Sequence, residues 1–373
     1  MKRIPVIHVD LSLPPSKRWQ HVPIRLRKAA KTLANRAADQ VGSPGMQSLA
    51  ELLTDAATAV RNPYRDEVIA WATLTDLPRR RVLLSNMAYE LNAAAIIYND
   101  TVIPAVSNFW QRVKTGVGAI RGSAKACTSG AAYYPACGMV HVRAMDWPLA
   151  GLGRHTVIWH MTGGEAGDYY NIGWPGYVGV ISGMAPGRFS ATINQAMPFS
   201  KPSLQWPPSH LLRYVFDNAA DYDDAIAILE CTPVCFPAFV TLVGTQPGEA
   251  AIIELTPSKN RIHPMTRKQP IAIANDYLSG DWRAKCGETD RTIKPHLKGN
   301  TSGYNDSENR RNTMLAQLKT NKPESVEGVI DIIREIEPLD NECTVQLMAF
   351  LPATGQCLVI GQEEQDPVCV GGV

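Results

Sequence analysis

The residue pattern changes about a third of the way along the 373-residue chain, and this change constrains the fold most. Residues 24–40 are mostly Ala, Leu, Lys and Arg, which are strong helix formers. In residues 46–60, apolar side chains recur every three or four positions, as on one face of a helix. Similar patterns predict helices at residues 65–74 and 78–91. The first part of the chain is therefore expected to be almost wholly helical.

After about residue 95, short stretches rich in Val, Ile, Thr and aromatic residues alternate with Gly and Pro, which is typical of strands and turns. Strands are expected at residues 137–147, 156–162, 177–184, 188–195, 236–244, 250–255, 270–274, 344–350 and 357–360. Helical patterns interrupt them at residues 209–216, 222–230, 308–319 and 325–336. Pro186-Gly187 predicts a hairpin turn, and Asp221 predicts a helix cap. This order predicts an α+β fold with sheets stacked between helices.

The composition argues against several classes of function. The 37 basic residues nearly balance the 35 acidic ones, so a basic surface for nucleic acid is not indicated. No apolar run approaches the roughly 20 residues that a membrane helix requires. Residues 1–10 also lack the apolar region of a signal peptide. We therefore expect a cytoplasmic protein without an integral membrane segment.

The cysteines are expected to be reduced. None of the eight precedes Cys127, and without a secretory signal free thiols are favoured over disulfides. Cys231 and Cys235 could form a metal-binding pair, but no second pair or histidine accompanies them at ligand spacing. We expect neither a metal nor another cofactor.

Cys127 is the residue on which a functional interpretation can be built. It follows the small residue Ala126, precedes two hydroxyl residues, and is followed by a strand-like run with Arg143 and Asp146. A self-cleaving amidase with an N-terminal cysteine nucleophile needs such a thiol with an arginine and an aspartate close behind. An internal cysteine can also be a small buried hydrophobic residue, so both interpretations stay open at this point.

The spacing of Arg143 and Asp146 sets a geometric condition. Residues three positions apart in a regular strand point to opposite faces of the sheet. A shared site therefore requires a bend near Met145. The alternative is a structural ion pair between the arginine and the aspartate.

Several short motifs occur in the order typical of one enzyme family. They are Cys127-Thr128-Ser129, Arg143-x-x-Asp146, Gly176-Tyr177-Val178-Gly179, Gly183-Met184-x-Pro186-Gly187-x-Phe189-Ser190 and Thr192-Ile193-Asn194. Together they resemble the acid ceramidase and N-acylethanolamine-hydrolysing acid amidase family of N-terminal nucleophile hydrolases. The choloylglycine hydrolases are more distant relatives. Residues 13–19 and 366–369 resemble the two ends of a mature acid ceramidase, so the resemblance covers most of the chain.

The resemblance implies an αββα sandwich and a precursor that is cut between Ala126 and Cys127. Residues 1–126 would form a helical segment packed on the catalytic part, residues 127–373, and the two fragments would remain associated. The Cys127 thiol would attack the Ala126 carbonyl, and water would hydrolyse the resulting thioester. The freed α-amine, with a typical pKa of about 8, would then accept the thiol proton, so one residue supplies nucleophile and base.

The resemblance also implies roles for residues elsewhere. Arg143 would hold the thiolate or the substrate, and Asp146 would orient the α-amine. Asn194 and Asn275 would lie around the developing oxyanion, where a positioned amide stabilises the transition state. Arg310 would help to position the thiol. For Asn275 a turn position is the alternative, and for Arg310 an ion pair on a helix surface.

The expected reaction is hydrolysis of an N-acyl amine with an apolar acyl chain, such as a fatty-acyl amide, a ceramide-like lipid or an N-acyl amino acid. Residues expected to contact this small-molecule substrate are Trp174, Tyr177, Met184 and Gln195. One alternative is an acyltransferase of the same fold that passes the acyl group to an amine. Others are a thiol hydrolase with His141 or His155 as base, and a non-catalytic binding protein on a degenerate scaffold.

Three features depart from the family pattern. Val142 and Ala144 flank Arg143, where the family often has Gly and Asn. Gln195 follows Asn194 in place of a glutamate, which leaves acid-dependent activation open. The chain also lacks a cysteine before Cys127 that could link the two fragments, so packing alone would hold them together.

Overall fold

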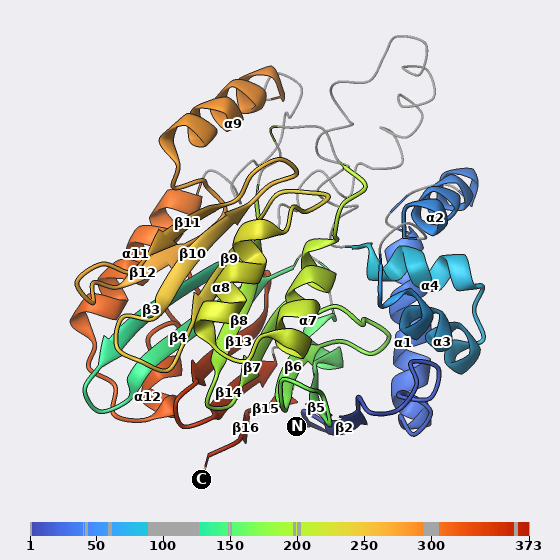
Figure 1. Ribbon diagram of the computed structural model, residues 1–373, viewed down its shortest axis with the longest axis horizontal. Helices are drawn as coiled ribbons and strands as arrows, with labels where there is room; N and C mark the ends of the chain where they lie inside the picture. The colour runs from blue at the N-terminus through green and yellow to red at the C-terminus, as the bar shows by residue number, and fades with distance from the viewer. Residues whose placement is uncertain are drawn as a thin grey trace.

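A computed structural model describes residues 2–39, 41, 44–58, 62–88, 127–147, 149, 151–196, 199, 203–293, 306–361 and 365–372. The predicted cleavage residue Ala126 lies outside these ranges. Two β-sheets are stacked on each other, and helices cover their outer faces (Figure 1). The predicted α+β fold with sheets stacked between helices is thus confirmed.

The larger sheet has eight strands and includes residues from the N-terminal segment. Its spatial order is β11 (Arg261–Pro264), β10 (Ala250–Leu255), β9 (Ala238–Val243), β8 (Phe189–Gln195), β7 (Ser182–Ala185), β6 (Tyr169–Gly173), β5 (Val157–Thr162) and β2 (Val6–Asp10). Neighbouring strands are antiparallel except β2, which runs parallel to β5 with Val6 opposite Ile158. The predicted hairpin joins β7 and β8, and Gly187 in its turn has a φ of 73°. Strand β2 therefore ties the start of the chain to the strands that follow Cys127.

The smaller sheet has six strands and carries Cys127 at its start. Its spatial order is β12 (Ile271–Ile273), β3 (Thr128–Tyr134), β4 (Gly138–Asp146), β13 (Thr344–Leu351), β14 (Gln356–Gly361) and β16 (Val368–Val370). The ladder between β4 and β13 is irregular between Thr344 and Gln346, which lie opposite Asp146 and Met145. This irregularity lies where the shared site required a bend. A separate pair is formed by β1 (Lys2–Arg3) and β15 (Gln365–Asp366).

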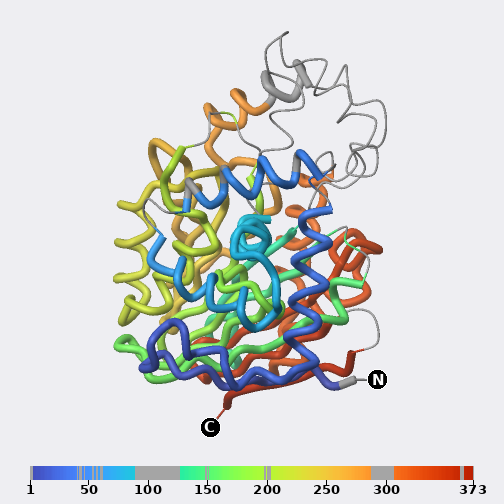
Figure 2. Tube along the Cα trace, turned by 90° about the vertical axis from the view of Figure 1, so that its right-hand side faces the viewer, coloured from blue at the N-terminus to red at the C-terminus, as the bar shows by residue number. Residues whose placement is uncertain are grey.

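Helices pack on the outer face of each sheet. Helices α7 (Pro208–Asn218) and α8 (Tyr222–Cys231) contact the larger sheet, and α11 (Ser307–Thr320) and α12 (Val326–Ile330) contact the smaller one. The predicted cap of α8 is confirmed, because the Asp221 side chain accepts the Asp224 N–H at 2.9 Å. The N-terminal helices α1 (Ile24–Asp39), α2 (Pro44–Thr58), α3 (Arg65–Thr75) and α4 (Arg79–Asn86) pack on one another beside the sheets (Figure 2).

Some elements differ from the prediction. Strands β3, β6 and β11 and helix α9 (Gly280–Ile293) were not predicted, and the helix predicted at residues 325–336 is α-helical only to Ile330. Strand β3 contains Gly130 and two alanines, which have low strand propensity, and its packing explains why a strand forms there. A Cβ on Gly130 would lie 2.8 Å from a methyl carbon of Leu318 on α11, so only a minimal residue fits.

The strand predicted at residues 177–184 begins only at Ser182. Its first half pairs with helices instead of a strand. The Val178 N–H donates to the Asn86 side chain, and the Val180 N–H donates to the Ser209 carbonyl oxygen.

Among the described residues, no helix combines the length and the apolar character that a membrane span requires.

Candidate active site

Cys127 lies directly before strand β3 and is fully buried. Its thiol is 3.4 Å from the Nη2 atom of Arg143 on the neighbouring strand β4. The β3–β4 pairing explains this contact, because Arg143 lies opposite Ser129, close to the start of β3. The structure thus brings the predicted nucleophile and the predicted arginine together.

Arg143 is fully buried among neutral partners. Its Nη1 atom donates to Oδ1 of Asn194 at 3.1 Å, and its Nη2 atom donates to the Ile193 carbonyl oxygen at 2.7 Å. Both partners lie on β8, so the guanidinium bridges the two sheets. The structural ion pair with Asp146, considered as an alternative, is not observed among the described residues. Arg143 therefore places a buried cation, with no carboxylate partner among the described residues, next to the Cys127 sulfur.

Asn194 fixes the backbone around Cys127. Its Nδ2 atom donates to the carbonyl oxygens of Cys127 at 3.1 Å and Ala274 at 3.0 Å. Its Oδ1 atom accepts from Arg143 and, at 3.4 Å, from the Ser129 hydroxyl. The amide hydrogens of Asn194 therefore face backbone carbonyls in the intact chain. Its oxyanion role stays a prediction.

Arg310 on α11 connects Asn275 to Cys127. Its Nη1 atom donates to the Cys127 carbonyl oxygen and the Thr128 hydroxyl, both at 2.9 Å, and its Nη2 atom donates to Oδ1 of Asn275 at 2.8 Å. Arg310 is 2% exposed, so a position on the helix surface is not observed. Burial lowers the pKa of Arg310 below its usual value, while the nearby Asp146 opposes the shift.

Asn275 is also fully buried, at the end of β12. Its Nδ2 atom donates to the Gln195 carbonyl oxygen at 2.8 Å, and its backbone N–H donates to the Ser307 hydroxyl at 2.9 Å. Its amide is thus part of the network around Cys127, whereas a solvent-exposed turn asparagine would not be. Like Asn194, it donates to a backbone carbonyl in the intact chain.

Asp146 ends strand β4, and its carbonyl oxygen lies 4.0 Å from the Cys127 sulfur. Its carboxylate accepts the Thr344 hydroxyl at 2.7 Å and the Asn341 amide at 3.0 Å. Burial raises the pKa of Asp146 to about 6, although these two donors and the nearby Arg310 oppose the increase. Asn341 and Thr344 were missed in the sequence, where Asn341-Glu342-Cys343-Thr344 has only the pattern of a turn before a strand.

Comparison with known proteins assigns the family. A sequence model described as acyl-coenzyme A:6-aminopenicillanic acid acyl-transferase matches residues 140–347, more than half of the chain. The chain belongs to this family. Similar curated proteins include acid ceramidase of Heterocephalus glaber, 25% identical over 67% of this chain and 63% of that protein. Human acid ceramidase is 22% identical over 99% of this chain and 88% of that protein.

Similar solved structures include a Caenorhabditis elegans N-acylethanolamine-hydrolyzing acid amidase ortholog. It has 20% identity and a TM-score of 0.47, over 61% of this chain and 93% of that one. Penicillin V acylase from Agrobacterium tumefaciens has 16% identity and a TM-score of 0.44, over 66% of this chain and 86% of that one. The predicted resemblance to acid ceramidases is confirmed by the sequence matches. The sequence matches agree with the expected enzyme class, an amide-bond hydrolase of the N-terminal nucleophile type.

In this acyl-transferase family member, the residues predicted to contact substrate fall in three places. Trp174 and Tyr177 line an apolar pocket together with Trp147 and helix α1. Gln195 is buried near the site, and its Nε2 atom has no hydrogen-bond partner among the described residues. Met184 does not join them, because it is fully buried on β7 within the main core and does not line the pocket.

The alternative with His141 as a catalytic base is not supported by its position. Its two ring nitrogens contact the hydroxyls of Ser190 at 2.9 Å and Thr192 at 3.1 Å. Burial and the nearby Arg143 lower the pKa of His141 to about 3, so it stays neutral. His155, the other candidate base, lies on the short 3₁₀ helix Gly153–His155.

Asn341→Ala is expected to destabilise the protein more at pH 7.5 than at pH 4. The folded pKa of Asp146, about 6, lies above its usual 3.8, so the folded protein loses stability through this group as the pH rises from about 4 to 6. The Asn341 amide offsets this loss only when the carboxyl is ionised. We expect an added cost of about 1–3 kcal/mol at the higher pH. Urea unfolding at both pH values, in a Cys127→Ala background that keeps one chain, measures the loss in free energy of unfolding. An equal loss at the two pH values would contradict the prediction.

Proposed function

We propose that this protein is an autoproteolytically activated cysteine amidase that hydrolyses N-acyl amines with an apolar acyl chain. The observation that carries the proposal is the contact between the Cys127 thiol and the buried Arg143 guanidinium, at 3.4 Å. Arg310 and Asn194 both donate to the carbonyl oxygen of Cys127, which fixes the backbone of the nucleophile. A structural buried cysteine does not need these contacts.

The first reaction would be the cut before Cys127. The sulfur attacks the carbonyl carbon of Ala126, the C–N bond to Cys127 breaks, and the nitrogen takes up the thiol proton as the acyl group moves to sulfur. Water then hydrolyses the thioester and returns the thiol, leaving a carboxylate on Ala126 and an α-amine on Cys127. The helical segment and the catalytic part would stay associated through strand β2 and the packed helices.

Substrate hydrolysis would repeat this chemistry on an external amide. The α-amine of Cys127 accepts the thiol proton, and the thiolate attacks the substrate carbonyl carbon. The amine product leaves with that proton, and water hydrolyses the acyl-enzyme to release the acid. Asp146, with its carboxylate held by Asn341 and Thr344, would orient the α-amine. Gln195 has an unused buried donor that a polar substrate group would satisfy.

The acyl chain would enter the apolar pocket. Trp147 follows Asp146 directly, so the pocket begins beside the residue whose carbonyl oxygen lies near the thiol. Trp174, Tyr177 and alanines of α1 extend its walls. Burial of a hydrocarbon chain against such walls contributes about 0.8 kcal/mol per methylene group.

A second candidate is acyl transfer to an amine, which the description of the matched family favours. Both reactions share the acyl-enzyme and differ only in whether water or an amine removes the acyl group. Partition between the two would depend on the concentration and fit of the accepting amine.

Incubation with a panel of amides tests the function. We expect N-acylethanolamines or N-acyl amino acids with long acyl chains to be hydrolysed about tenfold or more faster than penicillin V, because each buried methylene adds to binding. Ceramide and an added amine acceptor complete the panel, and mass spectrometry identifies acid or transferred acyl product. A protein that mass spectrometry shows cut before Cys127 yet inactive on every amide would indicate a binding protein.

A further inference from the structure

The N-terminal helices hold the loop that lines the apolar pocket. Asn86, at the end of α4 and 1% exposed, donates through Nδ2 to the Gly176 carbonyl oxygen at 2.8 Å. Its Oδ1 atom accepts the Val178 N–H, also at 2.8 Å. Tyr177 lies between these two residues. One buried amide therefore fixes the backbone on both sides of a pocket residue.

Gly176 allows this close approach. Its φ of 84° is in the left-handed region that favours glycine. A Cβ at this position would lie 2.9 Å from the Cβ of Ala30 on α1. The loop at residues 174–178 thus packs on α1 without room for a further side chain.

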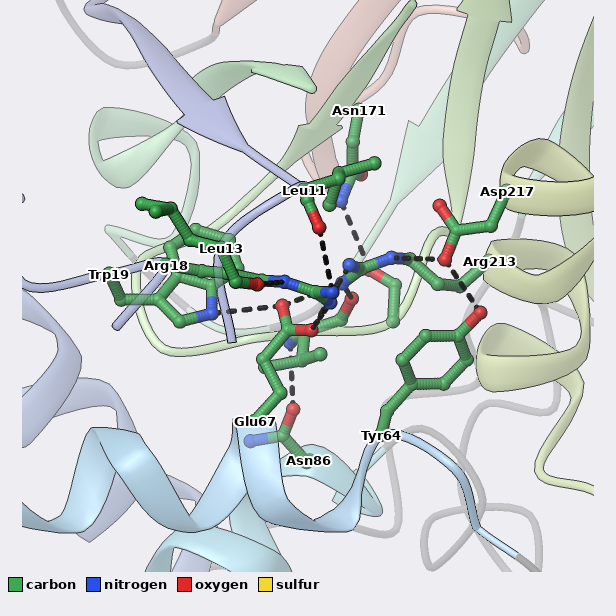
Figure 3. A network of polar contacts seen from close by, with 12 residues as sticks. Leu11, Leu13, Arg18, Trp19, Tyr64, Glu67, Asn86, Asn171, Arg213 and Asp217 are labelled. Carbon is green, nitrogen blue, oxygen red and sulfur yellow. Dashed lines mark hydrogen bonds and ion pairs between the residues drawn. The ribbon is translucent and has the colours of Figure 1, made fainter. Parts of the chain in front are cut away.

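A buried ion-pair network holds the same loop from the other side (Figure 3). Arg213 on α7 donates through Nη1 to the Val178 carbonyl oxygen at 2.9 Å and to Glu67 of α3 at 3.0 Å. Glu67 also accepts from Arg18 at 2.8 Å and from the Trp19 indole at 2.9 Å. Val178 is consequently held by Asn86 through its N–H and by Arg213 through its carbonyl.

We propose that Asn86 is a positioning residue that sets the substrate fit of the apolar pocket. Its clamp on Gly176 and Val178 places the Tyr177 side chain, and so the N-terminal segment acts on binding without touching the reacting atoms. This inference rests on the proposed function. Loss of the clamp leaves the part-buried Gly176 carbonyl and the buried Val178 N–H without this partner, and the loop shifts to recover one. KM then rises, while kcat, which depends on the groups around Cys127, changes little.

Asn86→Asp is the variant of choice because it keeps the size and the acceptor for Val178. It replaces the donor to Gly176 by an oxygen that repels the Gly176 carbonyl. Tyr64→Phe is the matched control, since it removes the 2.7 Å hydrogen bond from Tyr64 to Asp217 in the same network. Hydrolysis of N-lauroylethanolamine gives kcat and KM, and tryptophan fluorescence gives the Kd of laurate, because Trp147 and Trp174 line the pocket.

We expect Asn86→Asp to raise KM and the laurate Kd about tenfold, with kcat within about twofold of the wild type. Tyr64→Phe is expected to keep all three within about twofold and to lower the Tm by about 2–4 °C. Asn86→Asp lowers the Tm further, because its carboxylate is buried beside the Gly176 carbonyl. A folded Asn86→Asp protein with unchanged KM and laurate Kd would overturn the proposal. If Asn86→Asp does not fold, Asn86→Ala carries the same expectation.

The laurate measurement separates this proposal from the proposed function. A wild-type protein that binds laurate without hydrolysing any amide refutes the amidase, and the laurate Kd of Asn86→Asp still decides the role of the clamp. A wild-type protein that does not bind laurate up to about 1 mM overturns that role, because the pocket would then not take an acyl chain.

Discussion

A Cys127→Ala protein is expected to stay one chain of 373 residues and to lose all measurable amidase activity. Without the sulfur, neither the Ala126 carbonyl nor a substrate carbonyl has an attacking atom. In well-studied hydrolases, removal of a nucleophile that acts together with its base lowers kcat by a factor of about 10⁴–10⁶. Intact-mass spectrometry should find one species for this variant and two fragments for the wild type, the larger beginning at Cys127.

Cys357→Ala is the matched control for this experiment. Cys357 is as buried as Cys127 but lies on β14, and burial raises the pKa of its thiol well above the usual value. We expect its alanine variant to be cut and active. Hydrolysis that survives Cys127→Ala would refute the assignment of the nucleophile, and an uncut but active wild type would refute the cleavage step.

Glu67→Ala is expected to lower the free energy of unfolding by about 3–5 kcal/mol, because it removes the carboxylate that pairs with both terminal nitrogens of the buried Arg213 guanidinium and leaves only Asp217, 3.3 Å from Nε. Arg213 is 0% exposed and Glu67 1%, so water cannot replace the lost carboxylate. Burial opposes the charge on Arg213, yet Glu67 and Asp217 raise the pKa of Arg213 well above its usual value. Urea unfolding in the Cys127→Ala background measures the cost.

Two further variants make the Glu67 prediction specific. Asp66→Ala removes an exposed carboxylate from the same turn of α3 and is expected to change the free energy by less than about 0.5 kcal/mol. The double variant Glu67→Met with Arg213→Met removes both charges and should recover part of the loss. A cost for Glu67→Ala no greater than that for Asp66→Ala would contradict the prediction.

Elements with a strong local pattern could be predicted from the sequence, and those defined by packing could not. Helix α1 and strand β5 have residues whose propensity already matches their structure. Strand β3 does not, since its Thr-Ser-Gly-Ala-Ala start becomes a strand only between β4 and β12. Residues 177–180 have strand propensity, but the N–H groups of Val178 and Val180 donate to residues of α4 and α7 instead.

The site shows the same division. Arg143 could be singled out beside Cys127, but Asn194 could be proposed only from family resemblance, because nothing local to β4 or β8 says that the two strands face each other. Asn341 and Thr344 escaped notice because their importance depends on the irregular pairing of β13 with β4. Glu67 has charged neighbours on a helix, where acids are normally exposed. Its burial depends on Arg213, 146 residues further along the chain.

The parallel pairing of β2 with β5 has a consequence for refolding. In a protein cut before Cys127, the two strands belong to different polypeptides, and their pairing is no longer the closure of a loop within one molecule. Recovery from urea would then become a second-order process that slows on dilution, whereas the uncut Cys127→Ala chain would refold at a rate independent of its concentration. After the cut, fragments that separate at low concentration would reassociate too slowly to restore the folded protein.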